Sequence, residues 1–297
     1  MRALVTGSSG FLGGHVARHL SEVAGMEVSG FDMRPDPSGA FPVTVGDLAD
    51  LASLARACHG VDMVVHFGGV GDVYLATEQP DLAHRTNVEG TANIGKAAAE
   101  VGARVVYASS WEVYGPPAYD PLDERHPCHP GHVYAITKLG GEEALHAARA
   151  TCGLRVVILR LGTAYGTRMR PNAVFCRFAD AARRGDALVV HGTGRQWRQF
   201  THATDIARAV LLAAGSGIDG GTFNITADDS VTVLELAEII ANRYGAEVTF
   251  ADAREGDPHS ARISSAEALR VLGWRAQVEF RQGLSELLDD LDSRHSS

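Results

Sequence analysis

A tyrosine and a lysine four residues apart, in the run Tyr134-Ala-Ile-Thr-Lys138, have types and spacing that suit proton transfer. On a helix, residues four apart are neighbours on one face. A lysine charge about 4 Å from a phenolate, at an effective dielectric near 20, contributes roughly 4 kcal/mol. That equals about 3 pK units, which would bring a phenol pKa from about 10 towards neutrality. Tyr134 could then act as base and acid near pH 7, although an amphipathic helix with an exposed lysine shows the same spacing.

A second group of reactive side chains lies upstream of this pair. Ser109 and Ser110 end the apolar run of residues 105–108, which reads as a buried strand, and Glu112 follows after Trp111. A hydroxyl can hold a substrate oxygen, and a carboxylate can move a proton. Elimination of water needs one group that takes a proton and another that delivers one.

The first sixteen residues predict the element that would hold a nucleotide. An apolar strand over residues 3–5 breaks at Gly7, and apolar residues at helical spacing resume at Phe11, with further glycines at Gly10 and Gly13. Glycine lets the backbone approach a pyrophosphate, which the unpaired N–H groups of a helix N-terminus attract. Asp32 ends the next apolar run, near the distance of about 20 residues expected of an acid that binds a ribose hydroxyl.

The rest of the chain alternates strands with helices, which predicts a doubly wound parallel α/β sheet of Rossmann type. Functional groups should then gather at the carboxyl ends of the strands. We expect long helices over 81–100 and 133–150, and a short last helix over 264–273 before a polar tail. We assign 1–166, with about 200–225, to the nucleotide-binding domain, and 167–199 and 226–297 to a smaller α/β substrate-binding lobe.

Composition narrows the classes of function. The 297 residues carry a net charge of -9, which argues against a nucleic-acid partner. The four scattered cysteines form no C-x-x-C pair and suit a reducing compartment. Because the chain starts directly with its first strand and no apolar run approaches about 20 residues, we expect a cytoplasmic protein without a membrane span.

These motifs together resemble the extended short-chain dehydrogenase/reductases that act on nucleotide sugars as epimerases and dehydratases. The resemblance covers nearly the whole chain and rests on a set of short motifs. They are Gly7-x-x-Gly10-x-x-Gly13, Asn87-Val-x-Gly90-Thr, Ser110 with Val113-Tyr-Gly115, Tyr134-x-x-x-Lys138, Leu159-Arg160 with Tyr165-Gly166, Gly192-x-Gly194, Arg198-x-Phe200, Arg254-Glu-Gly-Asp257 and Leu272-Gly-Trp274.

The family roles carry over to matching positions. Ser110 would bond the reacting sugar oxygen, Tyr134 would move its proton, and Lys138 would hold the nicotinamide ribose. Substrate contacts would also come from Trp111, Thr163, Arg198, Arg254 and Asp257, with the two arginines on the diphosphate and Asp257 on the ribose. Cofactor contacts would come from Gly7, Ser9, Gly10, Phe11, Leu12, Gly13, Asp32, Arg34, Asp47, Leu48, Phe67, Gly68, Asn87, Ser109, Tyr134 and Lys138. Asp47 is equally suited to capping the next helix.

The acid at Asp32 favours NAD as the cofactor, since it would repel a 2′-phosphate, whereas Arg34 would suit NADP. Two positions depart from the family pattern. Thr163 stands where many relatives have asparagine, and Trp111 stands where dehydratases have an aspartate beside their glutamate. Glu112 remains.

We therefore expect a nucleotide-sugar 4-epimerase that works through a 4-keto sugar. The alternatives are a 4,6-dehydratase or a UDP-glucuronate decarboxylase-type lyase that uses Glu112, a keto-sugar reductase, and a non-catalytic NAD(H) sensor. The loop from His126 to His132 contains thiol and imidazole groups, but we expect no metal there. The resemblance also implies a homodimer through the helices at 82–100 and 133–150.

Overall fold

The computed structural model of the chain describes residues 1–36, 38–253 and 261–295. Its centre is a seven-stranded sheet in the order β11-β6-β5-β4-β1-β2-β3, with every neighbouring pair parallel. The strands are β1 (Arg2–Thr6), β2 (Glu27–Asp32), β3 (Val43–Val45), β4 (Met63–His66), β5 (Arg104–Ser110), β6 (Val156–Leu161) and β11 (Gly220–Ile225). The strand order reverses between β1 and β4, where a doubly wound sheet opens a crevice for a ligand.

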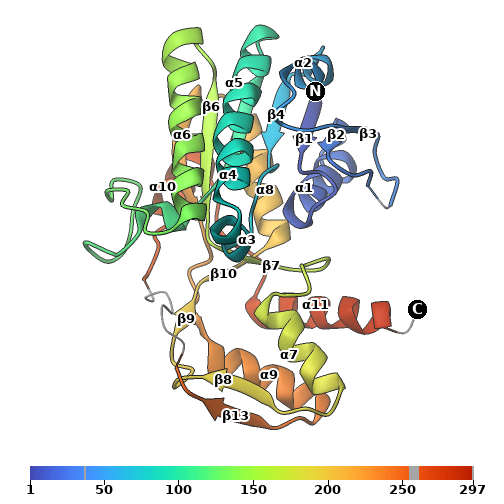
Figure 1. The fold of residues 1–297 in the computed structure, drawn as a ribbon, viewed down its shortest axis with the longest axis vertical. Helices are drawn as coiled ribbons and strands as arrows, with labels where there is room; N and C mark the ends of the chain where they lie inside the picture. The colour runs from blue at the N-terminus through green and yellow to red at the C-terminus, as the bar shows by residue number, and fades with distance from the viewer. Residues whose placement is uncertain (37, 254–260, 296–297) are drawn as a thin grey trace.

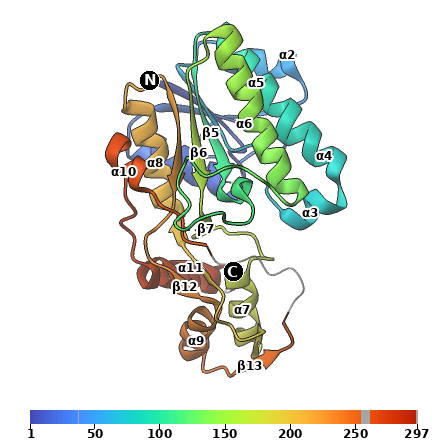
Figure 2. The same cartoon turned by 90° about the vertical axis from the view of Figure 1, so that its left-hand side faces the viewer.

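Helices cover both faces of this sheet (Figures 1 and 2). Successive strand residues point to opposite faces, so Ala3 and Val5 pack with one set of helices and Leu4 with the other. The first set is α1 (Phe11–Glu22), α8 (Ala203–Gly215) and α10 (Ala266–Leu272). The second set is α2 (Leu51–Cys58), α5 (Gly90–Glu100) and α6 (Val133–Cys152). The doubly wound architecture expected from the sequence is confirmed.

A smaller lobe lies below the carboxyl edge of the sheet in Figure 1. It contains α7 (Val174–Arg183), β8 (Leu188–His191), β9 (Trp197–Arg198), β12 (Val231–Thr232), α9 (Val233–Tyr244), β13 (Val248–Ala251) and α11 (Phe280–His295). β13 pairs with β8 in parallel, and β12 pairs with β9 in antiparallel. α9 begins with a capping box between Thr232 and Glu235 and ends at Gly245 with φ 70°.

Short elements join the two parts. β7 (Thr163–Tyr165) and β10 (Phe200–His202) pair in parallel, and the aromatic rings of Tyr165 and Phe200 belong to the core of the small lobe. On the large lobe, α3 (Val73–Glu78) and α4 (Pro80–His84) follow the end of β4, and the 3₁₀ turn η2 (Trp111–Tyr114) follows the end of β5.

Three elements differ from the sequence expectation. The helix expected over 81–100 is α4, a π turn η1 (Arg85–Glu89) and α5, with Asn87 inside the π turn. The polar tail expected after residue 273 was wrong, because 280–295 form α11, whose leucines are buried in the small lobe. α10 belongs to the stretch 226–297 that we assign to the small lobe, but its buried residues pack with α8 and the sheet of the large lobe.

None of the helices in residues 1–36, 38–253 and 261–295 combines the length and the apolar character that a membrane span requires.

Candidate active site

Ser110, Tyr134 and Lys138 come together where the end of β5 meets the start of α6. Ser110 is the last residue of β5, and Tyr134 and Lys138 lie in the first two turns of α6. The helix starts here because the His132 side chain caps it, with Nδ1 accepting a hydrogen bond from the Ala135 N–H at 3.5 Å. The strand end and the helix start therefore place a hydroxyl, a phenol and an ammonium group in one region.

The Tyr134 phenol does not show the acidity that the spacing predicted. Burial raises the pKa of Tyr134, and the Glu112 carboxylate raises it further. A hydrogen bond with Ser110 and the charge of Arg170 lower this pKa, but by less. Lys138 is directed elsewhere, since its Nζ donates to the Ala108 carbonyl at 2.5 Å. The expected effect of Lys138 on the phenol is therefore absent from this structure.

Lys138 is nine-tenths buried, and its surroundings lower the pKa of its ammonium group. Its Nζ lies 4.6 Å from the centre of the Tyr107 ring. Burial lowers the pKa of Lys138 to about 8, and the Glu142 carboxylate acts in the opposite direction. The pKa of the ammonium group therefore lies close to physiological pH.

Glu112 forms a second acid/base group beside Tyr134. Its Oε2 lies 3.4 Å from Nε2 of His132, and the His132 ring stacks on that of Tyr134 with centroids 6.1 Å apart. Burial raises the pKa of Glu112, while Arg198 and Arg170 lower it. Oε2 is buried and makes no hydrogen bond to any described residue. The sequence did not indicate His132 as the neighbour of Glu112.

The glycine turn after β1 is shaped for a close ligand. Gly7 has φ 67°, and a Cβ there would lie 2.8 Å from the Gly68 backbone nitrogen. A Cβ on Gly13 would collide with the Gly7 carbonyl, so the start of α1 packs directly on the turn. Asp32, at the end of β2, accepts hydrogen bonds from the N–H groups of Ser9 and Arg34, each at 3.1 Å. These contacts place the acid beside the helix N-terminus, as a dinucleotide site requires.

A buried chain of hydrogen bonds supports the next turn, at the end of β4. The His66 ring bonds Thr6 Oγ1 at 2.7 Å through Nδ1 and Thr91 Oγ1 at 2.9 Å through Nε2. Thr91 donates to the Asn87 carbonyl, and Thr6 accepts from the Gly68 N–H at 3.0 Å. Nε2 therefore carries the proton, because the Thr91 hydroxyl hydrogen is already used. Sequence reasoning missed His66, whose only signal is a histidine ending an apolar strand.

Asn87 connects this turn to α6. Its Oδ1 accepts from the Val70 N–H at 2.8 Å, and its Nδ2 donates to the Val70 carbonyl and to Thr137 Oγ1, both at 3.0 Å. The π turn around Asn87 aims this side chain inwards, which is a common use of such turns at functional sites.

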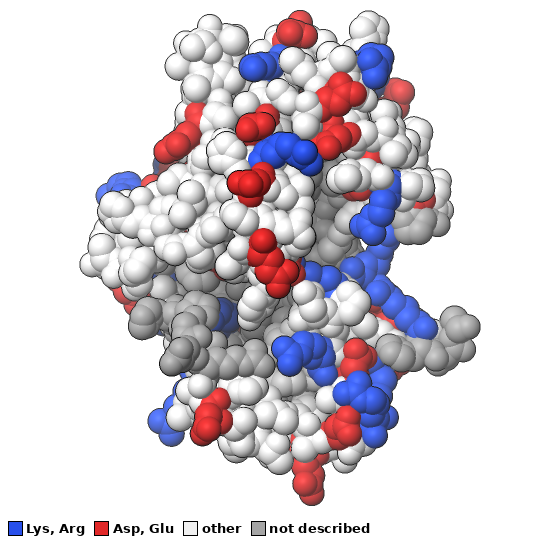
Figure 3. Space-filling view, viewed as in Figure 1, with Lys and Arg blue, Asp and Glu red and all other residues white. Residues whose placement is uncertain are grey.

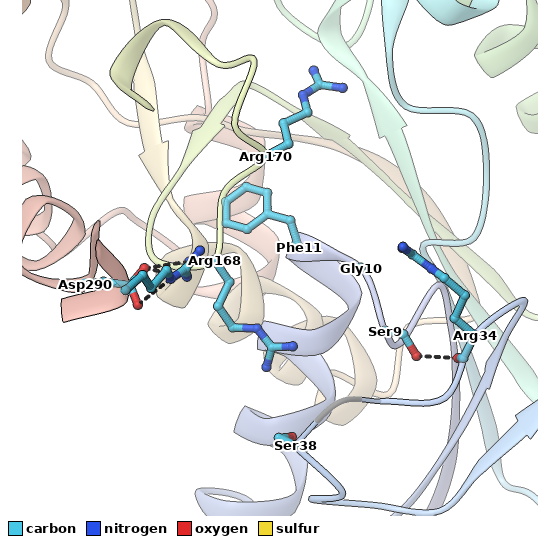
Figure 4. Close-up of a pocket in the computed structure, with 9 residues that line it drawn as sticks. Ser9, Gly10, Phe11, Arg34, Ser38, Arg168, Arg170 and Asp290 are labelled. Atoms are coloured by element: carbon cyan, nitrogen blue, oxygen red, sulfur yellow. Dashed lines mark hydrogen bonds and ion pairs between the residues drawn. The ribbon is translucent and has the colours of Figure 1, made fainter. Parts of the chain in front are cut away.

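An open groove of roughly 600 Å³ runs beside the glycine turn. It is lined by Ser9, Gly10, Phe11, Arg34, Ser38, Arg168, Arg170, Asp290 and Arg294. Figure 3 shows Lys and Arg side chains gathered where the two lobes meet on this face. In Figure 4, Arg168 points towards the Ser38 loop, while Arg170 extends in the opposite direction. The sequence reasoning named Arg34 but neither Arg168 nor Arg170.

The segment 167–172 ties the small lobe to the large one across this groove, and we call it the strap. The Thr167 carbonyl accepts from His15 Nε2 at 2.7 Å, and Arg168 Nη2 lies 3.4 Å from Asp36 Oδ1. On the other side, Asp72 Oδ2 accepts from Arg170 Nη1 at 3.0 Å and from Asn172 Nδ2 at 2.9 Å. The strap thus has attachments after β2 and after β4.

The other residues expected from the sequence lie in the turn after β3, in β7, in η2 and in β9. Asp47 accepts from the Ala49 N–H at 2.9 Å, and Asp50 is the residue that caps α2. Leu48 is buried, with Cδ1 in reach of Gly68, the residue after Phe67. Thr163 begins β7, Trp111 packs with Tyr114 and Leu122, and Arg198 is close enough to Glu112 to lower its pKa.

Two expected residues, Arg254 and Asp257, lie outside the described residues. In the His126 loop, His126 is buried and accepts from the Ala118 N–H at 2.8 Å, and it also bonds the Pro127 carbonyl. Among the described residues, no three His, Cys, Asp or Glu side chains are grouped for a metal ion.

Comparison with known proteins gives one family. Residues 3–226 match the model of the NAD dependent epimerase/dehydratase family. The UDP-glucose 4-epimerase of Mycolicibacterium smegmatis is 30% identical, over 97% of this chain and 98% of its own. A UDP-N-acetyl-alpha-D-glucosaminuronate decarboxylase of Bacillus cytotoxicus is 32% identical, over 80% and 79%. The structure of MoeE5 in complex with UDP-glucose and NAD superposes with a TM-score of 0.91 at 32% identity, and the match covers all of both chains.

Proposed function

Because the chain belongs to the NAD-dependent epimerase/dehydratase family, we propose that it is a nucleotide-sugar 4-epimerase. The observation that carries the proposal is the hydrogen bond between Ser110 and Tyr134 at the end of β5, with Lys138 held nearby on the Ala108 carbonyl of the same strand. Trp111, which packs against Tyr114 and Leu122, stands where a dehydratase has the second carboxylate. The arrangement therefore provides for oxidation of a hydroxyl and lacks one of the two acids that elimination uses.

The described residues fit the family cofactor, NAD. The turn from Gly7 to Gly13 has no room for a Cβ at its contact points, and Asp32 lies beside it. The N–H groups at the start of α1 would hold the pyrophosphate, and Asp32 the adenosine ribose. When bound, NAD supplies the acceptor and donor of a hydride.

Ser110 would hold the oxygen at C4 while Tyr134 takes the proton of the C4 hydroxyl. A 4-keto sugar would result once the hydrogen on C4 has left as a hydride to the bound cofactor, and return of that hydride to the opposite face of the sugar would invert C4. Return of the proton from Tyr134 to the same oxygen completes the cycle after the sugar has presented its other face. For this step the pKa of Tyr134 must fall from its raised value. Protonation of Glu112, whose own pKa is raised, removes one cause of that elevation.

The sugar that we propose is a UDP-hexose or UDP-hexuronate. MoeE5, which matches the whole chain at 32% identity, has been seen with UDP-glucose and with UDP-glucuronic acid, each with NAD. Arg198, and Arg254 by family resemblance, would bind the diphosphate of such a substrate. The positive groove also suits an anionic ligand in a chain of net charge -9.

A lyase is the second candidate, and one observation favours it. Glu112 Oε2 is buried without a hydrogen bond to any described residue, and His132 lies 3.4 Å away. Such a pair can take a proton from the carbon beside a ketone and exchange it with solvent. After the same first oxidation, loss of water would need this proton abstraction and a proton delivered to the leaving hydroxyl. Loss of carbon dioxide would instead need a proton delivered to the carbon that carried the carboxylate.

Proton NMR of the protein with NAD and separate UDP-, dTDP-, GDP- and CDP-hexoses and UDP-glucuronate tests both candidates. A product of unchanged mass with an altered coupling at C4 supports epimerisation. A product lighter by water or carbon dioxide contradicts it and supports the lyase. No turnover of any sugar by a protein that binds NAD overturns both.

The change Glu112→Gln separates the two mechanisms by activity. An epimerase should keep most of its kcat, because Tyr134 and not Glu112 moves the proton of the C4 hydroxyl. In a lyase, kcat should fall about 10²- to 10⁴-fold, which is the usual contribution of an acid/base group. The exposed Glu143→Gln is the control, and equal loss in both variants would contradict this assignment of Glu112.

A further inference from the structure

The carboxylate of Glu142 lies in the interior, one turn beyond Lys138 on α6, and neither the motifs nor the proposed mechanism use it. The residue is 1% exposed. α6 approaches the sheet closely at this point, since a Cβ on Gly141 would lie 2.5 Å from Tyr107 Oη and 2.8 Å from the Asn87 carbonyl. A charged group so deeply buried is costly unless its neighbours compensate it.

Two strands of the sheet hold this carboxylate. Arg160 of β6 donates to it twice, from Nε to Oε1 at 3.0 Å and from Nη2 to Oε2 at 2.7 Å. The Ser109 hydroxyl of β5 donates to Oε1. Ser109 directly precedes Ser110, so the bonds to Glu142 fix the end of β5 against the helix that carries Tyr134 and Lys138.

Arg160 is itself fixed. Its guanidinium lies 4.7 Å from the centre of the Tyr114 ring, and the Tyr114 hydroxyl donates to Asn224 Oδ1 of β11 at 2.7 Å. The network therefore extends from α6 through β5 and β6 to the edge strand. A buried pair of this kind contributes little to stability compared with well-packed apolar residues, so stability alone does not account for it.

Glu142 also acts on Lys138 through its charge. The groups that face Lys138 are Tyr107 of β5, whose pKa is raised, His66 of β4, whose pKa is lowered to about 3, and Glu142 on its own helix. Tyr107 and His66 are therefore neutral near pH 7. Cys128, in the loop before α6, faces the Arg160–Glu142 pair, and its pKa is raised. Among the described groups that act on Lys138, Glu142 supplies the negative charge.

We propose that Glu142 is a positioning residue of the active site. Held by Arg160 and Ser109, it fixes the start of α6 against the end of β5 and keeps Lys138 in its ammonium form. The charge effect is a property of the folded chain alone, whereas the effect on catalysis rests on the proposed function.

The sequence offers a direct measurement, because Lys96 and Lys138 are its only lysines. NMR of the full chain labelled with ¹³Cε-lysine should give two signals, and Lys96→Arg assigns them. Lys138 should titrate near pH 8 in the native protein. In Glu142→Gln, which keeps the shape of the side chain, the pKa of Lys138 should fall by about one unit or more. In Glu143→Gln, the exposed neighbour, it should stay unchanged.

If Lys138 has the same pKa in the native protein and in Glu142→Gln, the charge effect is overturned. This outcome does not depend on which reaction the protein catalyses. The variant Glu142→Asp tests the positional effect, and it also keeps the proposal testable if Glu142→Gln does not fold. It keeps the charge but shortens the reach to Ser109 and Arg160. We expect an almost native Lys138 pKa with kcat lowered about tenfold or more at unchanged KM. Native kcat in a folded Glu142→Asp protein would overturn the positional effect.

Discussion

Tyr134 shows how far the chemistry of one residue depends on neighbours distant in sequence. Glu112 raises its pKa, Ser110 and Arg170 lower it, and burial outweighs them all. Lys138, its helical neighbour by spacing, bonds the Ala108 carbonyl instead. The phenol is therefore protonated at neutral pH in this structure, and a change of charge around it must accompany its use as a base.

Tyr134→Phe should abolish oxidation of the sugar. The ring keeps its packing against His132, but no group remains to take the proton, so kcat should fall about 10²- to 10⁴-fold. Appearance of NADH absorbance on addition of sugar measures the first half of the reaction. Tyr74→Phe, at an exposed position, is the control. Full activity in the Tyr134 variant would remove this residue from the mechanism.

Among the elements, β1 and β4, between which the strand order reverses, carry the turns of the proposed cofactor site. The glycine turn after β1 and the turn after β4 contact each other at Gly7 and Gly68. The hydrogen bonds through His66 join these two strands to α5. His66 must be neutral for this chain of bonds, because a protonated ring could not accept from Thr6.

This requirement gives a pH dependence of stability. The pKa of His66 is lowered to about 3 in the folded chain, against about 6.5 when unfolded. The unfolded chain therefore binds more protons below pH 6.5, so the stabilisation is complete above that pH and is lost as the pH falls. Between pH 7 and pH 5 the loss of stability due to His66 should be about 2 kcal/mol.

Urea unfolding of the native chain and of His66→Gln at several pH values measures this effect. The variant should be less stable at pH 7, and the difference should narrow by about 2 kcal/mol towards pH 5. Because the other histidines are common to both proteins, the comparison isolates His66. A difference that does not vary with pH would show that the folded chain tolerates a charged His66.

At the scale of the whole molecule, the strap joins the lobes over the groove beside the glycine turn. Its bonds to Asp36 and Asp72 lie on opposite sides of the crevice where the strand order reverses. A dinucleotide bound in that crevice would lie beneath these attachments. The strap should therefore slow exchange of the cofactor, which suits a reaction that returns the same hydride to the sugar.

Asp72→Asn tests the strap without destroying the start of α3. An asparagine still caps the helix, as Asp72 does through Oδ1, but the ion pair with Arg170 is lost. The pair is half exposed, so its loss should speed release of NAD only about two- to fivefold. Stopped-flow displacement of NAD measures the rate, and the exposed Asp81→Asn is the control. An unchanged release rate would show that the strap does not retain the cofactor.

The homodimer remains a proposal at this scale. α5 and α6 lie side by side on the same face of the large lobe in both views, and Ile136 of α6 is 53% exposed. Light scattering of the purified chain, with Ile136→Glu as the variant, measures whether these helices form the interface.

Local spacing along the chain was enough to predict the doubly wound sheet and the glycine turn, and it supplied the candidate residues of the active site. Apolar runs mark the strands, and the interval of four residues between Tyr134 and Lys138 matches one helical turn. Both can be recognised without knowing how the chain folds. Which groups face one another depends on how the elements pack, and spacing along the chain does not give it. His132 beside Glu112, Lys138 on Ala108 and Glu142 between two strands are contacts across elements, and so are the pKa values that follow from them. α11 escaped the sequence reasoning because its polar face dominates its composition, and its leucines gain a partner only when the small lobe packs.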